Sequence, residues 1–121
     1  MLNTWMSVLL SACLLFQVGL AQAQDYPSRP VKLLVPFPPG GPTDITGRTL
    51  AQKLSERWNQ PVVVENRPGA SSIIGTDIAA KSAPDGYTIL LGSNSIALQP
   101  LLRSKLPYDP QRDLAPVILA V

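Results

Sequence analysis

The chain has 121 residues, enough for one small domain, with a formal net charge of +2 and no histidine. The missing histidine excludes His-based general base catalysis and the common His-containing zinc sites within this chain, and it argues against a hydrolase. The basic residues are scattered along the sequence, so no stripe for binding nucleic acid is predicted.

Residues 1–23 are predicted to be a signal peptide. No charged side chain precedes Asp25, the stretch 8–20 is almost entirely apolar, and Ala21-Gln22-Ala23 has the small-x-small pattern of a signal-peptidase site. The apolar run is too short for a comfortable membrane span. The mature chain, starting at Gln24, is therefore expected in the periplasm and would contain no cysteine, hence no disulfide, thiol nucleophile or thiolate metal site.

Two features of this leader leave an alternative open. No Lys or Arg precedes its apolar run, although such a charge is usual in a signal peptide. In addition, Leu10-Ser11-Ala12-Cys13 resembles a bacterial lipobox, in which Cys13 would carry a lipid anchor. The apolar run continues past Cys13, which favours cleavage after Ala23.

The mature chain opens with a predicted strand and a predicted helix. The apolar run Val31–Val35 is typical of a buried strand, and from Thr43 the apolar spacing changes to that of a helix. One face of this helix is expected to point inward, formed by Ile45, Leu50, Ala51, Leu54 and Trp58.

Further strands and helices are predicted downstream. In chain order they are a strand at Pro61–Glu65, a helix at Ile73–Lys81 with Ile74, Ile78 and Ala79 inward, a strand at Tyr87–Leu91, one or two helical turns at Ile96–Leu102, and a fourth strand at Ala115–Val121. Alternating strands and helices imply right-handed crossovers. The predicted fold class is therefore α/β, with a parallel βαβαβ arrangement.

The junction between the first strand and the first helix is the most informative segment. It reads Pro36-Phe37-Pro38-Pro39-Gly40-Gly41-Pro42-Thr43-Asp44. Its prolines stiffen the loop, its glycines let the backbone approach a ligand, and the first N–H groups of the next helix have no partner within that helix. Such a junction favours binding of a carboxylate or a phosphate.

Several residues of this junction have a structural interpretation beside the functional one. Gly40 and Gly41 could form a tight turn, and Phe37 could cover the core or give the ligand an apolar wall. Thr43 is either a helix cap or a hydroxyl donor. Asp44 is a candidate cap or loop organiser, and direct contact with an acidic ligand is disfavoured because the two charges repel.

Two more loops are expected at the carboxyl ends of strands, where open parallel sheets bind ligands. Ser71 and Ser72 lie in the first, before a helix, so they either cap that helix or contact the ligand. Ser93 and Asn94 lie in the second, where a ligand role is favoured. Arg67 is a cation near this predicted cleft, with pairing to Glu65 as the alternative.

Five segments of the chain resemble a known family, the periplasmic solute-binding receptors of tripartite tricarboxylate transporters, also called Bug receptors. They are Tyr26–Phe37, Gly40–Asp44, Gln60–Ala70, Ala83–Thr88 and Leu106–Pro110. The resemblance implies a two-lobed protein of the type II periplasmic binding protein class, which closes around a small carboxylic acid and delivers it to a membrane permease. It implies a binding protein without a cofactor, and not an enzyme.

The resemblance also implies that the loops at residues 37–44, 69–75 and 93–95 line the first lobe's half of the ligand cleft. Backbone amides, hydroxyls and ordered water are expected to hold the carboxylate there. The candidate ligand-binding residues in these loops are Phe37, Gly40, Gly41, Thr43, Asp44, Ala70, Ser71, Ser72, Ser93 and Asn94. Because family members are longer, residues 24–121 are expected to form the N-terminal part of the first lobe, without the rest of that lobe, the hinge or the second lobe.

Two alternatives come from other classes. The first is a truncated product without function, because a small domain that lacks sheet neighbours has little stability to lose. The second is a nucleotide-binding α/β domain. The sequence disfavours it, because Pro39-Gly40-Gly41-Pro42 is neither a G-x-G-x-x-G motif nor a P-loop with its lysine.

Overall fold

The strand β1 (Val31–Val35) lies at the centre of a parallel sheet in a computed structural model that describes residues 25–120. It pairs with β2 (Val62–Asn66) on one side and with β3 (Thr88–Leu90) on the other, so the strand order is β2-β1-β3. The predicted signal peptide and Cys13 lie outside the described residues.

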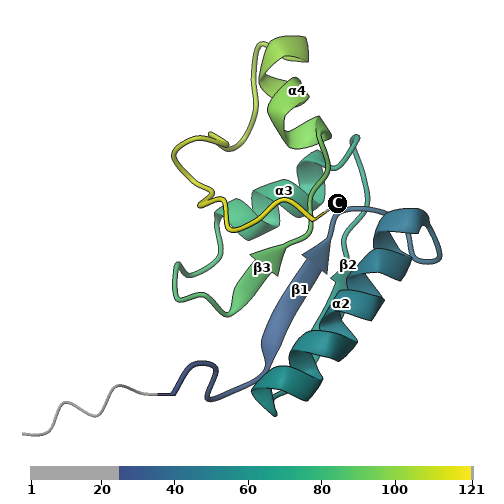
Figure 1. Cartoon of the computed structure of the whole chain (residues 1–121). Helices are drawn as coiled ribbons and strands as arrows, with labels where there is room; N and C mark the ends of the chain where they lie inside the picture. The colour runs from purple at the N-terminus through teal and green to yellow at the C-terminus, as the bar shows by residue number, and fades with distance from the viewer. Residues whose placement is uncertain (1–24, 121) are drawn as a thin grey trace, which may run out of the picture.

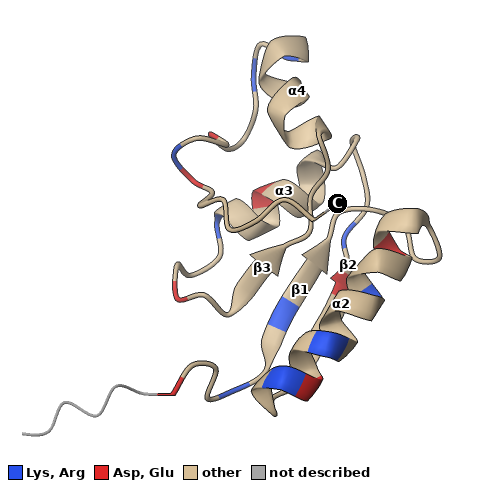
Figure 2. Ribbon diagram, in the orientation of Figure 1, with Lys and Arg blue, Asp and Glu red and all other residues tan. Residues whose placement is uncertain are grey.

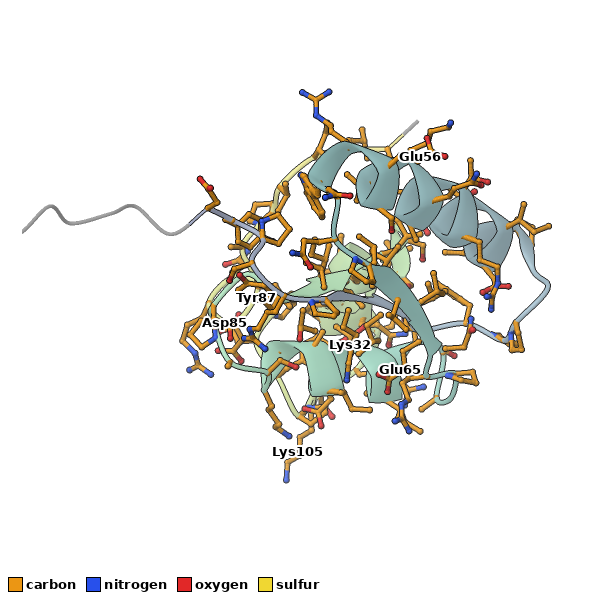
Figure 3. All side chains as sticks on the ribbon, turned by 90° about the horizontal axis from the view of Figure 1, so that it is seen from below. Lys32, Glu56, Glu65, Asp85, Tyr87 and Lys105 are labelled. Carbon is orange, nitrogen blue, oxygen red and sulfur yellow. The ribbon has the colours of Figure 1, made fainter. Side chains whose placement is uncertain are left out.

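The apolar composition of β1 follows from its position. The helices α2 (Pro42–Trp58) and α3 (Ile73–Ala80) cover opposite faces of the sheet (Figure 1, Figure 3), so a central strand needs apolar side chains on both faces. Accordingly, every β1 residue except Lys32 is fully buried. The parallel α/β fold predicted from the sequence is therefore confirmed.

The helix α2 packs on the sheet through a face that the sequence only partly revealed. It starts after the N-cap Gly41, with Pro42 in its first turn, and ends at Trp58, where the left-handed backbone of the C-cap residue Asn59 terminates it. Asp44, Gly47 and Ala51 are buried against the sheet.

The prediction for Ile45 was wrong, because its side chain is 59% exposed. Successive helical residues are turned by about 100°. A helix that buries Asp44 and Gly47 therefore directs Ile45 outward, whereas Leu54 and Trp58 stay half-buried on the inward side.

The helix α3 also faces the sheet differently from the prediction. Ile74 and Ile78 are exposed, by 49% and 37%, and Ala79 is half-buried, whereas Gly75 and Thr76 are buried. The reason is close packing. A Cβ added to Gly75 would lie 2.6 Å from the carbonyl oxygen of Arg67 and 2.6 Å from Cβ of Pro36, so only a glycine face lets α3 approach so closely.

The last described elements are the helix α4 (Ser95–Leu102) and an irregular segment. The predicted helical turns at Ile96–Leu102 are confirmed. The predicted fourth strand at Ala115–Val121 is wrong for its described part, 115–120, which has no regular structure and exposes Val117, Ile118 and Leu119 by 80–87%. Apolar composition does not make a strand, because a strand also needs a neighbour to pair its backbone groups.

Charged residues of both signs are interspersed along α2 and the loops (Figure 2). Exposed ion pairs join Arg29 to Asp85 and Lys53 to Glu56, while Lys32 pairs with Glu65 at 2.7 Å (Figure 3). Within residues 25–120, no helix has the length and apolar character needed to cross a membrane.

Candidate functional site

Three loops follow the carboxyl ends of the three strands. They are the β1–α2 loop (residues 36–41), the β2–α3 loop (67–72) and the β3–α4 loop (91–94), and they lie at the same end of the sheet (Figure 1). The chain runs from β1 to β2 on one side and later to β3 on the other. The strand order therefore reverses between β1 and β3, and open α/β sheets bind ligands in the crevice at such a point.

Asp44 holds the β1–α2 loop in shape. Its carboxylate, in a side chain only 4% exposed, accepts hydrogen bonds from the Gly40 backbone N–H (2.8 Å), Arg48 Nε (2.9 Å) and Asn66 Nδ2 (2.8 Å). Asn66 Nδ2 also donates to the Phe37 carbonyl oxygen at 3.1 Å. The two ends of the loop and the end of β2 are thus joined through one carboxylate.

These contacts keep Asp44 ionised. The hydrogen bond from Arg48 is the largest cause, followed by those from Gly40 and Asn66, and together they lower the pKa of Asp44 from 3.8 to about 2. The guanidinium of Arg48 also balances the negative charge, so the carboxylate repels a nearby anion less than a free aspartate would. Asp44 is not the helix cap, because Gly41 occupies that position, and the loop-organising interpretation fits its contacts.

The other predicted residues of this loop have different surroundings. Gly40 is exposed with φ +84°, a conformation that favours glycine, while no atom lies within 4 Å of the place of a Cβ. Gly41 has φ −80°, which any residue adopts. Thr43 is a half-buried residue of the first turn of α2, and Phe37 is half-buried at the start of the loop.

The β2–α3 loop ends in an unusual left-handed turn. Ala70, Ser71 and Ser72 have φ values of 47°, 55° and 76°, and Gly69 before them has φ 132°. A left-handed conformation costs a residue with a side chain about 1–2 kcal/mol. Three in succession persist only where the surrounding structure holds them, and such strain gathers at functional sites.

Two polar contacts from α4 hold this turn. Ser72 Oγ lies 2.9 Å from Ser95 Oγ, which in turn lies 2.9 Å from Ser93 Oγ. Gln99 Nε2 donates to the Ser71 carbonyl oxygen at 2.9 Å. Ser72 occupies the N-cap position of α3, but its hydroxyl makes no cap hydrogen bond. The residue is buried, with 2% of its surface exposed. The β2–α3 and β3–α4 loops are therefore joined.

Ser93 and Asn94 are both exposed at the start of α4. Asn94 is the N-cap residue of α4, without a side-chain cap hydrogen bond. Arg67 pairs with Glu65, with 2.6 Å between Arg67 Nε and Glu65 Oε1, so the alternative interpretation of Arg67 fits the structure. Hydrogen bonds from Lys32 and then Arg67 lower the pKa of Glu65.

Sequence reasoning missed three residues that organise the site: Arg48, Asn66 and Gln99. It placed Ser95 in a loop that lines the cleft but did not predict that Ser95 joins two loops. Arg48 stands four residues after Asp44, so helical spacing could have paired them. Ser95 and Gln99 share the same spacing, but nothing in the sequence says what that face of α4 contacts. Asn66 gave no local signal, because its partners are 22 and 29 residues away.

Other parts of the described structure are poorer candidates. A hollow of about 410 Å³ beside the end of α4 is lined by residues that include Pro100, Arg103, Leu106 and Tyr108, and none of the predicted site residues lines it. Residues 25–120 contain no group of three His, Cys, Asp or Glu side chains arranged to hold a metal ion.

A parallel sheet with helices on both faces and polar loops at one end is part of the fold of a periplasmic binding protein, a class whose solved members it matches. More particularly, the chain belongs to the family described as the tripartite tricarboxylate transporter family receptor, whose model matches residues 46–121. This is a family of receptors, in agreement with the prediction that the chain is not an enzyme.

Individual relatives agree with this assignment. Protein BugT of Bordetella pertussis is 53% identical over 97 residues, which are 78% of this chain and 30% of BugT. A solved R. palustris protein with adipate is 41% identical with a TM-score of 0.69, covering 72% of this chain and 29% of that one. MatC from Rhodopseudomonas palustris with bound malate is 34% identical with a TM-score of 0.61, covering 73% and 30%.

The chain spans about a third of the length of the curated relatives it matches, between 30% and 34%.

Proposed function

We propose that this chain forms part of the ligand-binding lobe of an extracytoplasmic receptor for a small carboxylate, which delivers its ligand to a tripartite tricarboxylate-type membrane permease. The observation that carries the proposal is the arrangement of the β1–α2 and β3–α4 loops on either side of the point where the strand order reverses. Two relatives of the same fold hold adipate and malate, both dicarboxylates, which supports this ligand class.

The loops offer groups suited to a carboxylate. The N–H groups of the first turn of α2 lie at the positive end of the helix dipole, and Gly41 provides no side-chain cap to occupy them. Ser71, Ser93 and Asn94 add exposed polar groups from the other two loops. In this proposal Asp44 and Ser72 position the loops, since both are buried and hydrogen-bonded, and the remaining predicted residues face the ligand.

The predicted signal peptide accords with the periplasmic location of the relatives, and export of this chain is part of the proposal.

A titration followed by amide NMR tests the proposal. Malate and adipate are expected to shift the backbone signals of Gly40, Gly41, Ser71 and Ser93, while the signals of Lys53 and Glu56, on the exposed face of α2, stay in place. The dimethyl ester of each acid is the matched control, because it keeps the carbon chain and removes the charge. Equal shifts with the esters, or shifts with ATP and none with the acids, would contradict a carboxylate site.

Denaturant unfolding of the same sample tests the alternative that the chain is a truncated product without function. A stable domain is expected to unfold in one sigmoidal step with denaturant. A chain that shows no such step would be a product that does not fold, and the proposed function would be withdrawn for it.

A further inference from the structure

We infer that Gln99 is the positioning residue that holds the left-handed turn Ala70–Ser72 in place and so makes the β2–α3 and β3–α4 loops act as one unit. The inference rests on the proposed function, because it assigns the turn a part in presenting groups to a carboxylate. The contacts themselves are independent of any ligand.

The burial of Gln99 is the first argument. Gln99 is a polar residue on a short surface helix, yet it is only 5% exposed. Its amide group is used on both sides: Nε2 donates to the Ser71 carbonyl oxygen at 2.9 Å, and Oε1 accepts from Arg103 Nε at 3.1 Å. A buried amide is tolerated where it is paired in this way, and a variant without the amide removes the side-chain donor that holds the Ser71 carbonyl oxygen.

The orientation of α4 is the second argument. Ser95 and Gln99 are four residues apart and so share one face of the helix, and both contact the turn. The apolar residues Leu98, Leu101 and Leu102 are instead exposed, by 45%, 81% and 75%. The helix therefore meets the turn through polar contacts.

The strain of the turn is the third argument. Ala70, Ser71 and Ser72 all have positive φ without being glycine, so the turn needs external support. Gln99 bonds the carbonyl group of the middle residue of the three. Ser95 reaches the hydroxyl of the last one and also the hydroxyl of Ser93, which links the support directly to an exposed residue of the candidate site.

Amide hydrogen exchange on the full chain tests the inference with Gln99→Met, which keeps the length of the side chain and removes both polar atoms. The N–H groups of Ile73 and Thr76, bonded to the Ala70 and Ser72 carbonyl oxygens, report on the turn. We expect their exchange to quicken about tenfold while that of Leu33 in β1 is unchanged, since losing one such bond frees the turn locally. Gln52→Met, an exposed glutamine on α2, is the matched control and should change neither.

Affinity for malate or adipate is the second measurement. Gln99→Met is expected to weaken the binding of whichever acid the wild type binds by about tenfold, and Gln52→Met to leave it unchanged. If Gln99→Met does not fold, Ser95→Ala removes the neighbouring contact and the same exchange pattern is expected.

The outcomes separate this inference from the proposed function. A wild type that binds neither acid defeats the carboxylate assignment, yet the exchange rates of Ile73 and Thr76 still decide the role of Gln99. Unchanged exchange at both amides, or an equal increase at Leu33, would show that Gln99 does not position the turn and would overturn the inference.

Discussion

Replacing Ala70 by glycine should stabilise the protein, whereas the same replacement in a helix should destabilise it. Ala70 is exposed and has φ 47°. Its methyl group therefore makes the left-handed backbone unfavourable and contributes no core packing in compensation. Ala97 offers the matched control, because it is also exposed but lies inside α4. The two variants, Ala70→Gly and Ala97→Gly, remove the same atoms from opposite backbone conformations.

The magnitude follows from the two conformations. Relief of the left-handed strain at alanine stabilises the folded state by about 1–2 kcal/mol. The larger conformational entropy of glycine in the unfolded chain offsets about 0.4–1 kcal/mol of this stabilisation. Ala70→Gly should therefore raise the free energy of unfolding by roughly 1 kcal/mol, or the melting temperature by about 4–8 °C for a domain of this size. Ala97→Gly should lower the free energy of unfolding by about 1 kcal/mol.

Urea unfolding monitored by circular dichroism measures both variants, with the slope m expected to be that of the wild type. Loss of stability in Ala70→Gly, equal to that in Ala97→Gly, would refute the reasoning. It would mean that residue 70 is not held in the left-handed region and that the turn is not strained there.

Three further predictions concern the core, the packing of α3 and the organising carboxylate. Leu34→Ala, in fully buried β1, should cost about 3–5 kcal/mol, and Leu101→Ala, at an 81% exposed position, less than about 0.5 kcal/mol, both by urea unfolding. Gly75→Ala should cost at least about 1–3 kcal/mol, because backbone atoms lie where its Cβ must go; a neutral result in thermal melts would contradict the packing of α3. The pKa of Asp44 is about 2 in the folded protein and 3.8 ordinarily, so its contribution is complete above pH 4 and is lost as pH falls toward 2. As the pH falls from about 4 to about 2, the melting temperature of Asp44→Asn should therefore drop less than that of the wild type. An equal drop in the two proteins would argue against the carboxylate contacts.

The elements of the fold could be predicted where local pattern and tertiary role agree. Every β1 residue except Lys32 is apolar, because helices cover both faces of the sheet, so the strand and its bounds were visible in the sequence. Strand β2 and helix α3 were likewise predicted to within one residue at each end, and the start of α2 was predicted to within one residue. Which helix face points inward was not visible, as Ile45 and Ile74 show, because close approach at Gly47 and Gly75 outweighs side-chain size.

The loops of the candidate site could be predicted from the sequence, whereas the side chains that hold those loops could not. The glycines and hydroxyl residues marked the three loops, since strand ends followed by such residues are readable along the chain. The side chains that hold the loops could not be predicted from the sequence, because Asn66 and Gln99 form hydrogen bonds with residues 22 to 29 positions away.

The sequence by itself determined the α/β class, the order of elements and the polar loops, because these depend on periodicity and turn chemistry among neighbouring residues. Only the tertiary structure decided the strand order, the irregular course of residues 115–120, the left-handed turn and the partners of Asp44 and Gln99. The physical reason is that pairing of backbone and buried polar groups is satisfied across space, by residues that chain distance does not identify.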